Sequence, residues 1–155
     1  MAGRRKKSKK QSAANSKRPE LVIFLDRNLG RTVVAERLRQ AGVRVEIHDD
    51  HFPDQRTPDD TWLRFVGERG WVAITPDARI RYRENERAAV RSANVRQFVL
   101  TARGLTGVEI GELLAAAIPK VRHLVEEFEP PFIGKITKGL SVSLYETFGK
   151  PKRRK

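Results

Sequence analysis

The sequence predicts an α/β fold with a mainly parallel central sheet, helices on both of its faces and a C-terminal β-hairpin. Two observations predict it. Short apolar runs alternate with amphipathic stretches between residues 21 and 100, and two further apolar runs beyond residue 130 are joined across a glycine. A chain of 155 residues with 39% apolar content suits one domain with a single core.

Four apolar runs are predicted to be strands, at residues 21–25, 43–47, 71–75 and 95–100. The first, LVIFL, has the length and the β-branched content of a buried strand. The second, VRVEI, alternates between apolar and polar residues, which is typical of a strand. Because helical stretches separate these runs, the strands are expected to pair in parallel.

The first predicted helix covers residues 30–42 and ends at Gly42. Its apolar stripe is formed by Val34, Leu38 and Ala41. The second lies in TPDDTWLRFVGERG, where Thr57 is the expected cap and Pro58 the first-turn proline. Its apolar face is formed by Trp62, Leu63, Phe65 and Val66. A third helix is predicted over residues 86–92.

The C-terminal third predicts a long helix followed by a hairpin. Residues 107–128 carry apolar side chains at helical spacing, and Pro119 is expected to kink or divide this helix. These side chains belong to Ile110, Leu113, Leu114, Ala117, Val121, Leu124 and Phe128. Residues 132–136 and 141–145 are predicted to form the hairpin, which extends the sheet or packs on its edge.

The net charge of +13 belongs to the two ends of the chain. Residues 1–18 contain eight basic side chains and no acid, and residues 150–155 contain five, which leaves 19 basic and 19 acidic residues in the predicted domain, residues 19–149. Both tails are expected to be disordered because they have too few apolar residues to form a core. They are either polyanion-binding arms or solubilising extensions.

Composition excludes several classes of site and protein. The chain has no cysteine, so disulfides and thiolate metal sites are excluded, and its three scattered histidines make a poor zinc site. Its apolar runs are far shorter than the roughly 18 residues of a membrane span. A cytoplasmic protein without membrane association is therefore expected. Signatures of a serine hydrolase, a dinucleotide-binding fold or a Walker-type nucleotide site are also missing.

Acidic residues follow two of the predicted strands. Asp26 comes directly after the first strand and Asp77 after the third, while Asp59 and Asp60 lie in the first turn of the second helix. Ligands of open α/β sheets bind beyond the carboxyl ends of the strands, so these acids are expected to converge there. Asp59 is favoured over Asp60 because helical spacing places it above Trp62, on the inward side.

Converging carboxylates repel one another, and a hard divalent cation such as Mg²⁺ or Mn²⁺ would neutralise them. Such an ion can activate water and stabilise charge on a phosphoryl oxygen, which is the chemistry of phosphodiester cleavage. The neighbouring guanidinium groups match phosphate geometry. The candidate phosphate-binding residues are Arg79, Arg81, Arg83 and Arg87.

Each of these residues also has an ordinary alternative. Asp26 and Asp77 are possible caps of the structure that follows them, and TPDD is nearly a capping box. The arginines are equally typical of a solvated helix face paired with Glu84 and Glu86. HDDH, at residues 48–51, is interpreted as a polar loop rather than a metal site, and His123 as a structural residue.

The segments VIFLDRNLGRTVVAERLRQAG, PDDTWLRFVGERGWVAITPDARIRYRENERAAV and RQFVL together resemble the PIN-domain ribonucleases, and among them the compact toxins of the VapC type. The resemblance covers about residues 20–130 and lies in the order and spacing of the motifs. It implies a three-layer PIN-like fold with a magnesium-dependent acidic cleft that cuts RNA. It also implies a cognate antitoxin partner and, in many members, a homodimer.

Carried over by residue, the resemblance implies that Asp26, Asp59 and Asp77 bind the metal and that Thr75 orients the metal or its water. The fourth acid of the family is Glu86 in this interpretation, with Asp60 as the alternative. The predicted function is a metal-dependent endoribonuclease whose basic tails add affinity for RNA. The alternative is a non-catalytic nucleic-acid-binding protein that acts through its tails, and a DNA nuclease on the same fold is a third possibility.

Overall fold

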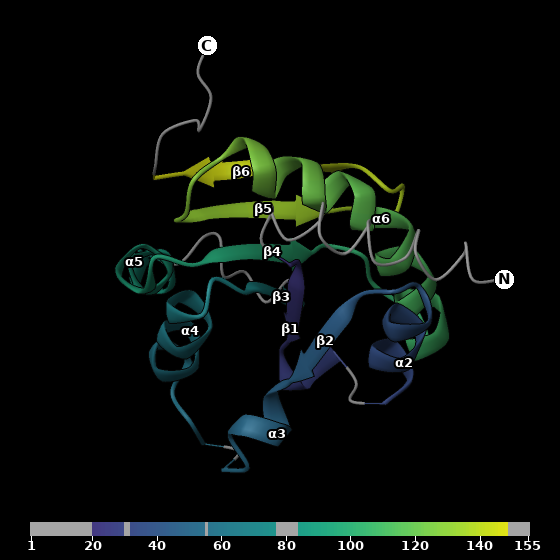
Figure 1. The fold of residues 1–155 in the computed structure, drawn as a ribbon, viewed down its shortest axis with the longest axis horizontal. Coiled ribbons are helices and arrows are strands. Elements are labelled where there is room, and N and C mark those ends of the chain that lie inside the picture. Colours follow the sequence, from purple (N-terminus) through teal and green to yellow (C-terminus); the bar gives the residue numbers. More distant parts are fainter. Residues whose placement is uncertain (1–19, 30–31, 55, 77–83, 149–155) are drawn as a thin grey trace, which may run out of the picture.

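The structure is a computed structural model that describes residues 20–29, 32–54, 56–76 and 84–148. The strands are β1 (Val22–Leu25), β2 (Arg44–Ile47), β3 (Val72–Pro76), β4 (Arg96–Leu100), β5 (Phe132–Ile136) and β6 (Val142–Thr147). The helices are η1 (Arg27–Leu29), α2 (Val33–Gln40), α3 (His48–His51), α4 (Asp59–Glu68), α5 (Glu84–Ala93) and α6 (Gly107–Glu127). The predicted alternation of strands and helices is confirmed (Figure 1).

The strands form one sheet in the order β2-β1-β3-β4-β5-β6. Neighbours from β2 to β5 pair in parallel, and β6 pairs antiparallel with β5. The predicted hairpin therefore extends the sheet. From β1 the chain moves outward to β2 and then returns to β3 on the other side of β1, so β1 and β3 flank the switch point at which such sheets bind ligands.

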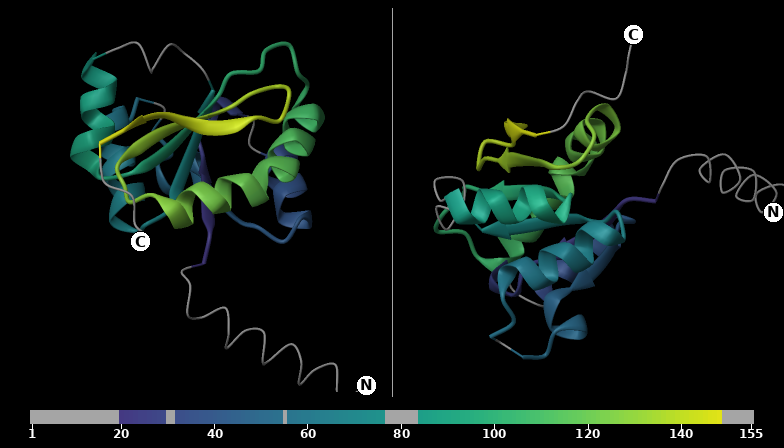
Figure 2. Two further views of the ribbon diagram at one scale, coloured as in Figure 1. Left: turned by 90° about the horizontal axis from the view of Figure 1, so that it is seen from above. Right: turned by 90° about the vertical axis from the view of Figure 1, so that its left-hand side faces the viewer.

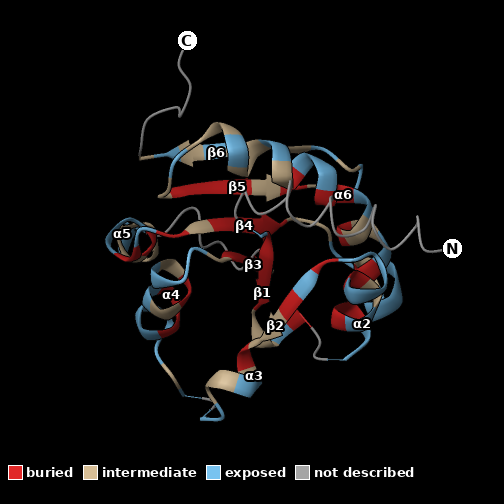
Figure 3. Cartoon of the chain, in the orientation of Figure 1, coloured by how far each residue is buried: buried red, intermediate tan, exposed pale blue. Residues whose placement is uncertain are grey.

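Helices cover both faces of the sheet, which confirms the three-layer α/β prediction (Figure 2). Helices α2 and α6 pack on one face, around Leu38, Leu114 and Phe98. Helices α4 and α5 pack on the other, around Phe24 and Val66. Because both faces are covered, β1 is buried along its whole length, as Figure 3 shows for the central strands.

Several local predictions were wrong at helix ends. Helix α2 begins only at Val33 and ends at Gln40. Its buried face contains Ala35 in addition to Val34 and Leu38, whereas Ala41 follows the last turn and is exposed. The Thr57 hydroxyl does not cap α4. It donates instead to the backbone carbonyl of Asp54 at 2.8 Å, and Pro58 takes the N-cap position.

Pro119 does not divide α6, which runs unbroken over 21 residues. The helix begins with a capping box formed by Thr106 and Glu109. Buried residues on both sides of the proline, Leu114 and Val121 among them, hold the helix against α2 and the sheet. This packing outweighs the backbone hydrogen bond that the proline cannot make. None of the helices in the described ranges combines the length and the apolar character of a membrane span.

The polar loop predicted for HDDH and the structural role predicted for His123 were wrong. HDDH forms the helical turn α3, and His48 is fully buried with its ring against Phe24, Phe52 and Trp62. Burial, followed by the charge of Arg27, lowers the pKa of His48, so the neutral ring packs as an aromatic. His123, expected to be structural, is instead 70% exposed on α6.

Gly67 in α4 lies very close to the end of α5. A β-carbon at this position would overlap the backbone carbonyl oxygen of Ala93. We therefore expect Gly67→Ala to destabilise the protein by roughly 1–3 kcal/mol, since backbone has to move to relieve the overlap. Urea denaturation measures this. Gly107→Ala is the matched control, because its β-carbon would meet Val33 only at ordinary contact distance. An equal effect of the two substitutions would contradict the close approach.

Candidate active site

Asp26 lies where β1 ends, at the switch point of the sheet. Its backbone N–H donates to the carbonyl oxygen of Ile74 in β3 at 3.1 Å, which fixes the position of Asp26 against that strand. Its Oδ1 accepts a long hydrogen bond, 3.4 Å, from the backbone N–H of Asn28 in the η1 turn. The capping alternative therefore holds in part, but one weak hydrogen bond leaves most of the carboxylate's capacity unused.

Asp59 is anchored to the aromatic core beneath the same region. The indole N–H of Trp62 donates to Asp59 Oδ1 at 3.0 Å. Trp62 is only 2% exposed, and its ring stacks on Phe24 with the centroids 5.5 Å apart. A helical spacing of three residues brings Asp59 and Trp62 together, as predicted. The first turn of α4 thus presents a carboxylate whose orientation is set by a buried side chain.

These two acids line one small pocket of about 150 Å³. Its other lining residues include Asn28, Thr75 and Glu86. The structure thus brings together four of the predicted site residues, which come from the end of β1, the start of α4, the end of β3 and the first turn of α5. We call this the acidic pocket. Asp77 follows β3 directly in the sequence, but Asp77, Arg79, Arg81 and Arg83 lie outside the described residues.

The charges in the acidic pocket are unfavourable to one another. Burial raises the pKa of the Asp26 carboxyl above its ordinary value, and the charge of Asp59 adds to this. The hydrogen bond from Asn28 and the charge of Arg27 oppose the shift without reversing it. A cation between Asp26 and Asp59 would relieve both the repulsion and part of the cost of burying the charge.

Two comparisons with known proteins bear on this arrangement. A family model described as "PIN like domain" matches residues 21–102, which is more than half of the chain. The chain belongs to the PIN-like domain family. This PIN-like domain is also 29% identical over 114 residues to "Putative ribonuclease VapC45" of Mycobacterium tuberculosis, over 72% of this chain and 82% of the relative. The resemblance to VapC-type PIN domains is confirmed. No solved structure matches the chain significantly.

The acidic pocket of this PIN-like domain offers the type of ligand atom, oxygen, that a hard divalent cation prefers. Asp26, Asp59 and Thr75 offer carboxylate and hydroxyl oxygens, which Mg²⁺ and Mn²⁺ prefer. In the described part of the chain, however, no cluster of three or more His, Cys, Asp or Glu side chains is arranged to hold a metal ion. Asp26 and Asp59 line the acidic pocket together, and the third predicted ligand, Asp77, belongs to residues 77–83, which the structure does not describe.

Asp26→Asn is expected to stabilise the PIN-like domain when no metal is present. Because the pKa of Asp26 is raised in the folded state, its ionised form destabilises the fold above that pKa. This destabilisation disappears as the pH falls below the ordinary pKa of an aspartate, where the carboxyl is protonated in both the folded and the unfolded state. Thermal denaturation in EDTA should show a higher Tm for the variant at about pH 7, with the difference narrowing towards about pH 4. A lower Tm for the variant at about pH 7 would contradict the unfavourable burial.

Thr75 is supported by a residue that the sequence analysis missed. Thr75 is 3% exposed, and its Oγ1 accepts a hydrogen bond of 3.0 Å from the Nε2 of Gln97, which is fully buried in β4. Gln97 Oε1 has no partner in the described part of the structure. A polar residue inside the apolar run RQFVL was the available signal, since buried amides are rare without a specific partner. Gln97 holds the Thr75 side chain from behind the acidic pocket.

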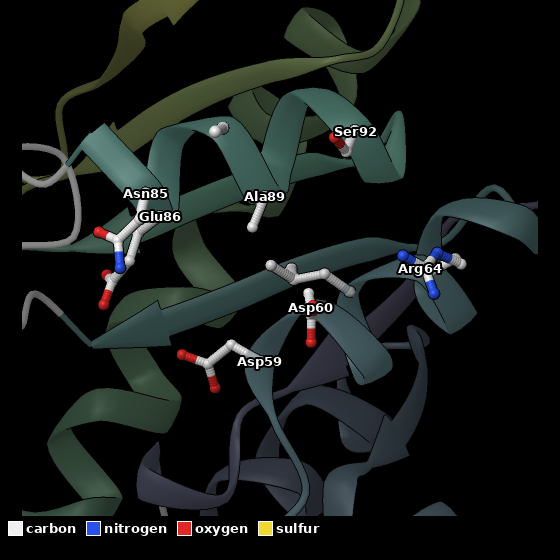
Figure 4. A pocket seen from close by; sticks show the side chains of 9 residues that line it. Asp59, Asp60, Arg64, Asn85, Glu86, Ala89 and Ser92 are labelled. Carbon is white, nitrogen blue, oxygen red and sulfur yellow. The ribbon is translucent and has the colours of Figure 1, made fainter.

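Two further predicted residues lie elsewhere. Asp60 does not line the acidic pocket but a neighbouring groove between α4 and α5 (Figure 4). Arg87, a predicted phosphate ligand, makes two short hydrogen bonds, of 2.7 and 2.6 Å, to the carboxylate of Glu146 in β6. Its guanidinium therefore links α5 to the C-terminal hairpin. It also pairs with Glu84 at 3.5 Å, one of the partners that the alternative of intramolecular pairing named.

Proposed function

We propose that this PIN-like domain is a metal-dependent endoribonuclease that hydrolyses RNA phosphodiester bonds at the acidic pocket. The observation that supports this most strongly is that Asp26, Asp59, Thr75 and Glu86, from four separate segments, line one pocket at the switch point of the sheet. Family membership and the similarity to a relative named as a ribonuclease support the same activity.

In this proposal Asp26 and Asp59 hold Mg²⁺ or Mn²⁺, and Asp77 is the third acid. When bound, the ion supplies activation of the attacking water and neutralisation of charge on the phosphoryl oxygens. Trp62 keeps Asp59 directed at the pocket through its indole hydrogen bond. Glu86 stands on the opposite wall, on α5, where its carboxylate can complete the donor set or accept a proton.

Phosphate binding falls to Arg79, Arg81 and Arg83 in this proposal, because Arg87 is engaged with Glu146. The basic tails raise the affinity for RNA without selecting a sequence, since their contacts are electrostatic. The charge of these tails also favours a second candidate, a nucleic-acid-binding protein without catalysis. That candidate has no use for adjacent acids that repel phosphate.

We further propose that the protein is the toxin component of a toxin-antitoxin pair, on the basis of its similarity to a protein named VapC45. The expected partners are RNA, a cognate antitoxin and, as in many proteins of this type, a second copy of the chain. Light scattering of the purified protein, alone and with a candidate antitoxin, measures whether it forms a dimer and whether it binds the antitoxin.

The test of the proposed activity is cleavage of a labelled RNA pool by the purified protein with Mg²⁺, with Mn²⁺ and with EDTA, and by Asp77→Asn in parallel. The proposal predicts cutting that requires metal and disappears in the variant. Binding without cutting, unchanged in Asp77→Asn, would instead support the non-catalytic candidate. A labelled single-stranded DNA pool with the same sequences, tested in parallel, distinguishes a ribonuclease from a DNA nuclease.

A further inference from the structure

A groove of about 420 Å³ lies between α4 and α5, beside the acidic pocket (Figure 4). Asp59 and Glu86 line both cavities, so the two adjoin at that end. A ligand whose reacting group occupies the acidic pocket therefore has room to extend into this groove. Its volume falls in the range of roughly 300–1,000 Å³ that is typical of small-ligand sites.

The walls of the groove suit a flat apolar group. Ala88, Ala89 and Ser92 on α5 are small and leave the space between the helices open, and the buried Leu63 of α4 closes it from below. The two alanines are half-buried, so their methyl groups form an apolar surface that water only partly covers. The face of a nucleobase is an apolar surface of this kind, and its edge needs the hydrogen-bonding groups that Asp60 and Asn85 offer at the rim.

The groove has opposite charges at its two ends. Asp59 and Glu86 lie at one end and Arg64 at the other, as Figure 4 shows. Arg64 lies five positions after Asp59 in α4, a rise of about 7.5 Å along the helix. This is close to the length of one nucleotide in an extended strand. Arg64 makes no hydrogen bond or ion pair with the residues that the structure describes, so its guanidinium is available to a ligand.

We propose that the α4–α5 groove binds the nucleotide next to the scissile phosphate of a single RNA strand. The scissile phosphate lies at the acidic pocket, the base packs against Ala88 and Ala89, and Arg64 binds the next phosphate along the strand. The planar guanidinium of Arg64 matches the geometry of phosphate oxygens. The carboxylate of Asp60 can accept hydrogen bonds from sugar hydroxyl or base amino groups. This inference rests on the proposed ribonuclease activity, and it adds to that proposal the path of the RNA strand across the protein.

The test is the steady-state cleavage of a short single-stranded RNA by Arg64→Ala and Ala89→Leu. We expect each to raise KM roughly tenfold with kcat much less affected, since one charge-assisted contact or the space for the base is lost away from the reacting atoms. Arg44→Ala is the matched control. It removes the same charge from the edge strand β2, where Arg44 pairs with Glu20 and Glu46, and should leave KM unchanged.

A binding measurement separates failure of the subsite from failure of the proposed activity. In an Asp26→Asn background, fluorescence anisotropy of a labelled RNA tetranucleotide should show a Kd raised about tenfold by Arg64→Ala and by Ala89→Leu. Unchanged KM and Kd in both variants, with Tm values like that of the wild type, would overturn the subsite even if RNA is cut. Weaker RNA binding by the two variants, with no RNA cleavage by the wild type, would support the nucleotide site in the groove and contradict the ribonuclease proposal.

Discussion

Asp26→Asn is expected to reduce RNA cleavage by at least about 100-fold while RNA binding persists. Asp26 is a half-buried acid of the pocket and would be a direct metal ligand, whereas even outer-shell partners of metal sites typically contribute 10- to 100-fold. Removing one negative charge beside a phosphate does not weaken RNA binding by itself. Single-turnover cleavage of end-labelled RNA, together with fluorescence anisotropy, measures the two effects separately.

Asp50→Asn is the matched control for this substitution. Asp50 is an exposed carboxylate on α3 and lines neither the acidic pocket nor the α4–α5 groove. We expect wild-type cleavage from it. Cleavage by Asp26→Asn at the wild-type rate would mean that Asp26 serves only to cap the η1 turn through Asn28.

Phe24→Ala is expected to lower the free energy of unfolding by roughly 3–5 kcal/mol. Phe24 is fully buried at the centre of an aromatic cluster, with its ring stacked on Trp62 at 5.5 Å and on Trp71 at 6.3 Å between centroids. Truncation leaves a cavity beside both indoles. Because Trp62 also holds Asp59, the folded fraction of the variant should cleave RNA more slowly than the wild type. Urea denaturation measures the loss of stability.

Two variants make this measurement specific. Phe24→Leu keeps most of the buried volume and should lose much less stability than Phe24→Ala. Val33→Ala shortens an apolar side chain that is 48% exposed and should change stability little. A free energy of unfolding for Phe24→Ala within about 1 kcal/mol of the wild type would contradict the central place of this ring in the core.

The strands were the part of the fold most accessible from sequence. The run at 21–25 differs from β1 by a single residue, because a strand buried on both faces has a continuous apolar sequence. The run at 95–100 also differs from β4 by one residue, although it contains Arg96 and Gln97. Helix ends were harder. Thr57 has the residue type of a cap, but its hydroxyl bonds to Asp54, and nothing in the local pattern distinguishes the two partners. Pro119 failed as a helix breaker because packing with α2, distant in sequence, holds α6 together.

The site was predictable where it follows from topology. Asp26 and Asp59 converge because strand ends and helix starts meet at one edge of a parallel sheet, and Glu86 was placed by resemblance to the family. Contacts between distant segments were not predictable. Arg87 and Glu146 are 59 residues apart, and Gln97 meets Thr75 only because β3 and β4 are neighbours in the sheet. Such pairs depend on register, which no single segment encodes.

The most direct test of the central claim is isothermal titration of Mn²⁺ into the wild type, Asp26→Asn, Asp59→Asn and Asp60→Asn. If Asp26 and Asp59 hold a divalent ion in the acidic pocket, the wild type and Asp60→Asn bind Mn²⁺ with similar affinity, and each of the other two variants binds at least about tenfold more weakly. Equal Mn²⁺ binding by all four proteins would contradict the account, because the ion would then lie away from the acids that the fold brings together.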